Sequence, residues 1–353
     1  MLATSTFVQT LKRRPWTLAL ITFAFVGVVS FGSAKEFYPF GEGELLGAEP
    51  GSGAEEASNP FDGVKFYVDP NSAASKQAEA WRATRPEDAA QIDKIASQPS
   101  AYFFSEWTLD EPGGTVGQVR HRVSEITATG ALPVLGAYAI PHRDCGRYSR
   151  GGFTTGDQYR AWIRDFAQGI GDHKAVVVLE PDALAGDYCL SEAQRQERYA
   201  LMKDAVEVLE ARPRVWVYID AGNPGWRTSE EIAVRLKKVG IEEADGFSLN
   251  VSNFTYTYDN VSYGSRISYL VGGKHFIIDT SRNGLGPAPD GSWCNPPGRA
   301  LGPKPTGNTG FPLVDAFYWL KAPGHSDGEC RGFPSAGKWV PDYALGLARR
   351  AAY

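Results

Sequence analysis

An acidic residue follows an apolar segment that has the length of a strand. Residues 175–180 form this segment, and Pro181 and Asp182 come directly after it. A continuous apolar run of this kind is typical of a strand buried on both faces, and a proline ends the strand because it has no amide hydrogen. Asp182 is therefore expected at the carboxyl end of the strand, where α/β proteins carry catalytic groups and where burial raises a carboxyl pKa. The alternative is that Asp182 only caps the next helix.

Acidic residues also follow other predicted strands, namely Asp144, Asp220, Asp279 and Asp327. In a barrel these strand ends meet at one rim, where several carboxylates repel one another and one is expected to keep its proton near neutral pH. This arrangement predicts glycosidic bond hydrolysis, in which one carboxyl donates a proton and another activates water. Binding of Mg²⁺ or Ca²⁺ is the rival use of such a cluster. We favour hydrolysis without a metal or cofactor, because no histidine lies at metal-ligand spacing.

Strand-like and helix-like segments alternate along the chain, which favours an α/β fold of parallel βα units closed, or nearly closed, into a barrel. The eight predicted strands are residues 64–68, 101–104, 133–139, 175–180, 215–219, 246–251, 275–279 and 316–320. The amphipathic segments predicted as helices include residues 72–82, 117–129, 158–170, 192–209, 230–239, 261–270 and 343–351. Residues 283–312, rich in Gly and Pro, are predicted to form an ordered loop beside the barrel mouth.

The amino-terminal segment is typical of export. Lys12, Arg13 and Arg14 precede a strongly apolar stretch without charges, so residues 1–34 are predicted to be either a cleaved signal peptide or a retained membrane anchor. Residues 35–60 lack periodicity and are predicted to be a linker, and the folded domain is expected from residue 61 to 353. The positive flank places this domain outside the cytoplasm, secreted or membrane-anchored.

The composition indicates which partners are excluded and whether the cysteines form disulfides. The net charge is −5 and the basic residues are scattered, which argues against binding of nucleic acid. The four cysteines of an exported chain predict two disulfides. Three pairings are possible, and we favour Cys145–Cys189 with Cys294–Cys330, since each would close a loop between neighbouring units.

Several short motifs occur in an order that points to one family. They are Asp62 with Tyr67–Pro70, then Tyr138–Cys145, Leu179–Asp182, Tyr218–Asn223, Asn250–Asn253, Asp279–Gly284, Trp293–Asn295 and Lys321–Gly328. From about residue 61 to its end, the chain resembles glycoside hydrolase family 6, the cellulase family of endoglucanases and cellobiohydrolases. The resemblance implies a single catalytic domain with a distorted TIM-like barrel, inversion at the anomeric carbon, and the disulfide pairing favoured above.

The resemblance also implies roles for individual residues. Asp182 matches the general acid, and Asp144 matches the carboxyl that keeps it protonated and is a candidate link to the attacking water. Asp327 matches the usual candidate base, and Tyr138 matches the tyrosine that crowds the sugar at the cleavage point. The positions expected to contact a β-glucan are Asp220, Asn250, Asn253 and Lys321, with Trp226 and Trp293 as aromatic platforms on the leaving-group side.

Four positions depart from the family pattern and lie where sugar contacts are expected. His325 stands where Glu is usual, Asn223 where His is usual, and Phe103, or Tyr102 in another register, where Trp is usual. Arg150 stands where a small residue is common. We count Phe103, Asn223 and His325 among the substrate-binding positions, and the added Arg and His favour an anionic or modified glucan.

The intervals between motifs are short and resemble those of open-cleft endoglucanases, so we expect a monomeric endo-β-1,4-glucanase. One alternative is a tethered glycan-binding or biosynthesis-associated protein with little or no turnover. The other alternative is a hydrolase of a different β-glycan.

Overall fold

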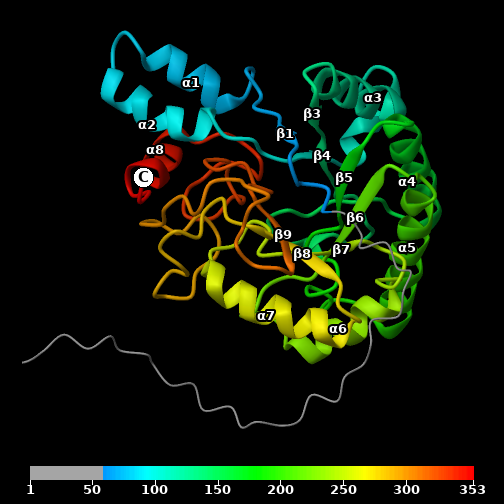
Figure 1. Ribbon diagram of the computed structural model, residues 1–353. Coiled ribbons are helices and arrows are strands. Elements are labelled where there is room, and N and C mark those ends of the chain that lie inside the picture. The colour runs from blue at the N-terminus through cyan, green and yellow to red at the C-terminus, as the bar shows by residue number, and fades with distance from the viewer. Residues whose placement is uncertain (1–58) are drawn as a thin grey trace, which may run out of the picture. The chain divides into compact units, whose positions relative to one another are not determined.

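The structure is a computed structural model that describes residues 59–353 (Figure 1). The predicted signal or anchor, residues 1–34, lies outside the described residues, as does the predicted linker up to residue 58. Asn59 already belongs to the folded part, because its Nδ2 donates a hydrogen bond of 2.9 Å to the carbonyl of Asp315. Within residues 59–353, no helix combines the length and the apolar character needed to cross a bilayer.

The main sheet has seven parallel strands, which lie side by side in the order of the sequence. They are β2 (Tyr102–Phe104), β4 (Val134–Ala137), β5 (Ala175–Leu179), β6 (Val215–Asp220), β7 (Gly246–Leu249), β8 (His275–Asp279) and β9 (Val314–Tyr318). Because every connection leads to the next strand in the same direction, the sheet curls toward a barrel, as the sequence predicts. Beside its two edge strands, the amide of Ala101 donates to the carbonyl of Trp319 over 3.0 Å, but β2 and β9 do not pair with each other.

The first predicted strand does not join this sheet, so the prediction of eight barrel strands is wrong by one. Strand β1 (Lys65–Phe66) pairs with β3 (Ala131–Leu132) in a separate two-stranded sheet. Pro133 separates β3 from β4, because a proline cannot donate to the ladder. After Phe66 the chain turns outward, and Val68 is 40% exposed. The barrel therefore stays open between β2 and β9.

Eight helices are present in the described part of the chain. They are α1 (Ala73–Trp81), α2 (Pro86–Ala96), α3 (Gly114–Thr127), α4 (Gly156–Ile170), α5 (Glu192–Glu210), α6 (Ser229–Lys238), α7 (Thr257–Leu270) and α8 (Pro341–Arg349). Helices α3 to α7 follow the strands and flank the sheet, whereas α1, α2 and α8 pack together elsewhere (Figure 1). Helix α2 has no counterpart among the predicted segments, although Pro86 in its first turn, followed by Glu87 and Asp88, is a helix-start signal.

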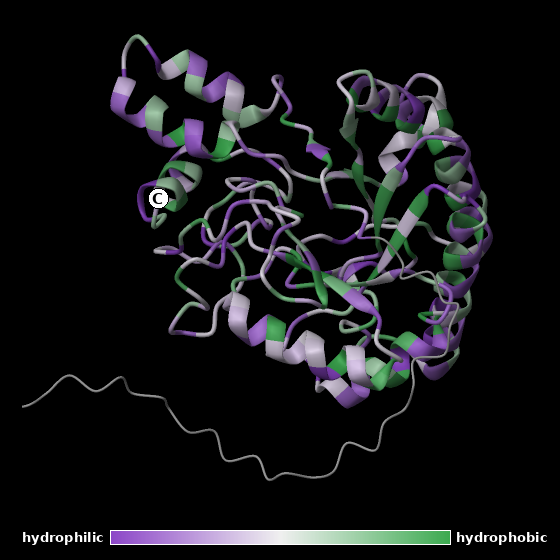
Figure 2. Ribbon diagram, viewed as in Figure 1, coloured by the Kyte–Doolittle hydropathy of each residue, from purple (hydrophilic) through white to green (hydrophobic). Residues whose placement is uncertain are grey.

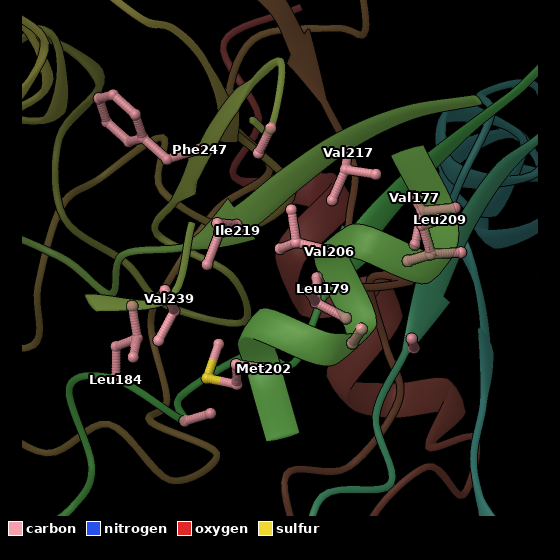
Figure 3. Close-up of a cluster of buried hydrophobic side chains, with 14 of the residues drawn as sticks. Val177, Leu179, Leu184, Met202, Val206, Leu209, Val217, Ile219, Val239 and Phe247 are labelled. Carbon is pink, nitrogen blue, oxygen red and sulfur yellow. The ribbon is translucent and has the colours of Figure 1, made fainter. Parts of the chain in front are cut away.

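The largest hydrophobic cluster lies between the sheet and its helices. Met202, Val206 and Leu209 project from one face of α5 toward Val177 of β5 and Val217 of β6 (Figure 3). Their spacing of three and four residues gives α5 one apolar face, and burial of each such side chain stabilises the fold by about 1.5–3 kcal/mol. The strand segments are accordingly the most hydrophobic parts of the ribbon, while the outer helices alternate in hydropathy (Figure 2).

Capping boxes fix the starts of α4, α5 and α6. Thr155, Ser191 and Thr228 each accept a hydrogen bond from the backbone three residues later, and the side chain there bonds back to the cap residue. Each such cap stabilises a helix by about 1 kcal/mol. The caps therefore fix the point at which each of the loops after β4, β5 and β6 ends and its helix begins.

Candidate active site

Asp182 lies directly after β5, in a loop with unusual backbone conformation. Glu180 and Asp182 have φ angles of 49° and 70°, which are uncommon for residues other than glycine. Such conformations cluster at functional sites, where the surrounding structure stabilises them. Pro181 stands between the two residues and ends the strand, as the sequence predicts.

The carboxyl of Asp182 is held neutral near pH 7. Burial raises its pKa, the charges of Asp220 and Asp144 raise it further, and the pKa reaches about 8. The hydroxyl of Tyr138 donates to Oδ2 of Asp182 over 3.3 Å. This tyrosine lies under the guanidinium of Arg143, 4.7 Å from its ring, and meets the edge of Phe103 at 6.3 Å. The arrangement offers a protonated carboxyl at the end of a strand, which is what a general acid needs.

Asp220 positions the loop that carries Asp182. Its Oδ2 accepts hydrogen bonds from the amides of Asp182, at 2.9 Å, and Gly222, at 3.1 Å, and its Oδ1 accepts one from Ser248. Burial raises the pKa of Asp220 to about 6. The sequence predicts that this side chain contacts substrate, but it is only 1% exposed and its oxygens are already occupied. Its geometry is that of a positioning residue.

Asn250 is also buried, although substrate contact is predicted for it. Its Oδ1 accepts a hydrogen bond from the amide of Thr255, and its Nδ2 donates to the carbonyl of Asp279. Asn223 is buried as well and accepts from the amide of Gly225, whereas Asn253 is half-buried. Of these three asparagines, Asn253 has the most accessible side chain.

Asp144 lies in the loop after β4 and has a φ angle of 51°. Its Oδ2 accepts a hydrogen bond of 2.7 Å from the amide of Ser149, and its side chain is half-buried. Burial raises the pKa of Asp144, although the nearby charges of Arg147 and Arg143 and the bond from Ser149 oppose the shift. Asp144 thus adds a second acidic group near Asp182.

Two buried charged residues fasten the loops of Asp144 and Asp182, and sequence reasoning missed both roles. Glu180 accepts hydrogen bonds from the amides of Ala139 and Ile140, and burial raises its pKa to about 7. Arg198 of α5 is 3% exposed and donates to carbonyls of both loops, with distances of 3.0–3.4 Å. The Arg198 acceptors are the carbonyls of Pro141, His142, Ala183 and Gly186. An arginine in an amphipathic helix is expected to face solvent, so the residue types alone carry no signal for this role.

Both predicted disulfides form. Cys145 and Cys189 join the loops after β4 and β5, and Cys294 and Cys330 join the loops after β8 and β9. The favoured pairing is therefore confirmed. Each bridge lies next to a loop that carries a predicted catalytic aspartate, Asp144 or Asp327.

Asp327 is surrounded by donors. Its Oδ2 accepts from Nη1 of Arg282 and the amide of Asn295, both at 2.9 Å, and its Oδ1 lies 3.2 Å from Oγ of Ser252 and 3.3 Å from Nζ of Lys321. Burial alone would raise the pKa of Asp327, but the charges of Arg282 and Lys321 outweigh it and lower the pKa. Both oxygens are thus engaged and the carboxylate is held charged.

His325 lies two residues before Asp327 and packs edge-on against Trp339, with ring centroids 5.8 Å apart. Burial lowers the pKa of His325 to about 4, and the charge of Lys321 contributes. The imidazole is therefore neutral at the pH where the sequence suggested that it would titrate. His325 therefore adds no positive charge near neutral pH, and it does not provide the attraction for an anionic glucan that the sequence suggested for it.

The two predicted tryptophan platforms remain accessible. Trp226 is 36% exposed and Trp293 is 38% exposed. Tyr148, from the loop after β4, meets Trp293 edge-on at 5.7 Å. The side chain of Tyr148 also lies close to Gly328, where a Cβ would fall 2.4 Å from that of Tyr148. The loop of Asp144 thus contacts the loops after β8 and β9.

Metal-ligand geometry is not seen at these carboxylates. Within residues 59–353, no three His, Cys, Asp or Glu side chains are grouped so that they could hold a metal ion.

Comparison with known proteins gives one consistent family. Residues 61–351 match the family model described as Glycosyl hydrolases family 6. The chain is 42% identical over 290 residues to Endoglucanase A of Cellulomonas fimi, covering 82% of this chain and 62% of that protein. It is 41% identical over 302 residues to Endoglucanase 1 of Streptomyces halstedii, covering 79% of this chain and 87% of that protein. The chain thus spans less than two thirds of the Cellulomonas fimi relative.

A solved structure gives the same result. The endoglucanase Cel6 from Mycobacterium tuberculosis, determined in complex with methyl-cellobiosyl-4-deoxy-4-thio-β-D-cellobioside, is 47% identical. Its TM-score is 0.79, and the match covers 84% of this chain and all of that chain. Endoglucanase CEL6B from Humicola insolens aligns at 27% identity with a TM-score of 0.72, covering 83% of this chain and 98% of that one.

Proposed function

Because the chain belongs to glycosyl hydrolases family 6, we propose that it hydrolyses internal β-1,4-glucosidic bonds of cellulose or related soluble β-glucans, with inversion at the anomeric carbon. The relatives named endoglucanase, at 41–47% identity, support this substrate and an endo mode of cleavage. The observation that carries the proposal is the neutral carboxyl of Asp182, whose pKa of about 8 results from burial and from the charges of Asp220 and Asp144.

In the proposed reaction, Asp182 donates its proton to the oxygen of the leaving sugar. Protonation of that oxygen makes the bond easier to break, and general acid catalysis of this kind contributes about 10²–10⁴-fold. The hydroxyl of Tyr138 donates to Oδ2 of Asp182, and the backbone amide of Asp182 donates to Asp220. The acid is thus oriented before the substrate arrives, which reduces the reorganisation needed in the reaction.

The proton of the attacking water must pass to a second carboxylate. Asp327 is the base implied by the family resemblance, but its oxygens are engaged by Arg282, Lys321, Asn295 and Ser252, and its pKa is lowered. Asp144 has a raised pKa, and no hydrogen bond reaches its Oδ1 from residues 59–353. We therefore assign proton acceptance to Asp144, directly or through a water, and a positioning and electrostatic role to Asp327.

The direct test uses the full chain and a soluble, neutral β-1,4-glucan. Inversion at a β-linked sugar gives the α-anomer as the first product, which proton NMR distinguishes from the β-anomer before the two equilibrate. An endo mode predicts that the viscosity of the solution falls early, while few reducing ends have formed. An initial β-anomer would contradict inversion, and binding of the glucan without new reducing ends would favour the non-hydrolytic alternative.

We further propose that the domain works outside the cytoplasm. The two disulfides support this location, since such bonds persist in oxidising compartments. The charged and apolar pattern of the first 34 residues supports export, either as a cleaved signal or as an anchor. Fractionation of the producing cell, with mass spectrometry of the mature amino terminus, separates the two.

A further inference from the structure

A depression of about 460 Å³ lies at the edge of the site, and the proposed reaction does not use it. Gly146, Arg147, Tyr148, Arg150 and Trp293 line it. The first four belong to the loop that carries Asp144, and Trp293 precedes the disulfide-bonded Cys294. We name this depression the Arg–Trp pocket, defined by Arg147, Tyr148, Arg150 and Trp293.

The two arginines of the Arg–Trp pocket are exposed, and within residues 59–353 neither forms an ion pair. Other arginines near the site are paired, such as Arg143 with Glu106 at 2.7 Å and Arg331 with Asp290 at 3.2 Å. The guanidinium of Arg147 is held by an aromatic ring instead, 4.7 Å over Tyr188. The pocket therefore presents two positive charges whose carboxylate-binding forks are unoccupied by protein groups.

The same pocket presents two aromatic rings. Tyr148 is 44% exposed and Trp293 is 38% exposed, and their edge-on contact holds both rings in place. An exposed aromatic face stacks on the apolar face of a sugar ring, while its edge contributes polar contacts. A pocket that combines such rings with unpaired guanidinium groups is complementary to a sugar that carries a negative charge.

We propose that the Arg–Trp pocket binds carboxylate-bearing sugar residues of a β-glucan chain and makes acidic β-glucans preferred substrates. The inference rests on the proposed hydrolase function and names its substrate class. The sugar ring stacks on Trp293 and Tyr148, and its carboxylate pairs with Arg147 and Arg150. Gly146 and Arg147 follow Asp144 in the same loop, and the charge of Arg147 acts on Asp144, so we place the bound sugar in the chain that passes the acid Asp182.

The test compares two soluble glucans of matched length, one carboxymethylated and one hydroxyethylated. For the full chain we expect a higher kcat/KM on the carboxymethylated glucan at low salt, and we expect added salt to reduce that preference. The variants Arg147→Gln and Arg150→Gln should each lower the ratio of the two kcat/KM values by about fivefold, and the double variant by more. The ratio matters because Arg147 also influences the pKa of Asp144, an effect that acts on both substrates.

Arg120→Gln is the matched control. Arg120 is exposed on α3, outside the pocket, and its replacement by Gln changes the net charge by the same amount as each pocket variant. It should leave the ratio unchanged. If the pocket variants also leave the ratio unchanged, while all proteins hydrolyse both glucans, the Arg–Trp pocket does not select charge and the inference is wrong. If the wild-type chain hydrolyses neither glucan, the proposed function itself fails.

A binding measurement gives an independent readout. The Asp182→Asn variant should bind a cello-oligosaccharide oxidised to the carboxylate at C6 more tightly than the unoxidised sugar. Adding Arg147→Gln and Arg150→Gln should abolish that difference in affinity, whereas adding Trp293→Ala should weaken the binding of both sugars. Equal affinities for the two sugars in the presence of both arginines would overturn the inference.

Discussion

Asp182 and Asp327 are two aspartates of one rim that are held in opposite charge states. Both carboxyls are largely withdrawn from water, so burial alone does not explain why their charge states differ. Burial does raise the pKa of both carboxyls. At Asp182 the charges of Asp220 and Asp144 add to that effect, whereas at Asp327 the charges of Arg282 and Lys321 exceed it. The sign of the neighbouring charges therefore decides which aspartate donates a proton.

The largest effect is expected from replacing the acid. Asp182→Asn keeps the size of the side chain but removes the proton, so hydrolysis of an unactivated glucan should fall by about 10²–10⁴-fold. Circular dichroism should show an unchanged fold. A substrate whose leaving group needs no protonation should lose much less activity, and near wild-type rates on the ordinary glucan would contradict the assignment.

The pH profile tests the charge state directly. A general acid works only when protonated, so kcat/KM should decline above pH 8, by about tenfold per pH unit well above the pKa. The raised pKa also affects stability: its favourable contribution is complete below the unfolded pKa near 4 and is lost as the pH rises through 8. Asp182→Asn should thus melt higher than the wild type at pH 8 but not at pH 4. The same difference in melting temperature at both pH values would show that folding does not raise the pKa of Asp182.

On the other side of the rim, the expected loss is one of stability. Asp327→Asn leaves the buried Arg282 without its carboxylate, and breaking such a pair costs about 3–5 kcal/mol. Asp290→Asn is the matched control, because its ion pair with Arg331 is exposed and screened by solvent, so its loss should cost much less stability. Chemical denaturation measures both. Equal losses would mean that Asp327 is not the charged anchor described here.

The disulfide between Cys145 and Cys189 should matter more for stability than for activity. The bridges span 44 and 36 residues, and the chain-entropy estimate gives about 4 kcal/mol for each. After Cys145→Ser and Cys189→Ser, Arg198 still binds carbonyls of both loops, so we expect activity at 25 °C to persist. The same variant with Arg198→Lys, which keeps the charge but loses the planar fork, should lose it. Inactivity of the cysteine variant with intact Arg198 would argue against this clamp.

The smallest effect is expected at His325. Its pKa of about 4 means that it is neutral over most of the working pH range, so His325→Gln should leave the pH–rate profile above pH 5 unchanged. His325→Glu places a negative charge beside Asp327 and should shift the profile. A shift with the Gln variant would show that the imidazole carries charge after all.

The sequence predicted the parts of the fold that depend on local patterns. The apolar run that forms β5 and its end at Pro181 are local, and so is the alternation that predicts parallel βα units. Pairing of β1 with β3 is not local, since it depends on how Pro133 divides one apolar segment into two short strands with different partners.

The same limit applies to the site. Asp182, Asp144 and Asp327 each follow a predicted strand in the sequence. Because the carboxyl ends of parallel strands meet at one rim, their proximity could be predicted. Whether Asp220 faces substrate or a backbone amide depends on its distance from Asp182 in space, which residue types do not specify. The buried cation that lowers the pKa of Asp327 comes from Arg282, 45 residues earlier in the chain.

The contact between the two ends of the domain has a consequence for its synthesis. Asn59 bonds to Asp315, 256 residues later, and Phe61 packs against Tyr318 inside the barrel. A ribosome adds about 5–20 residues per second. Asp315 and Tyr318 are therefore made about 10–50 s after Asn59 and Phe61, which they contact. The apolar strands β4 to β8 are therefore made before the barrel can close. The nascent chain should depend on chaperones until β9 has left the exit tunnel, because such long-range closure is slow and exposes strand edges.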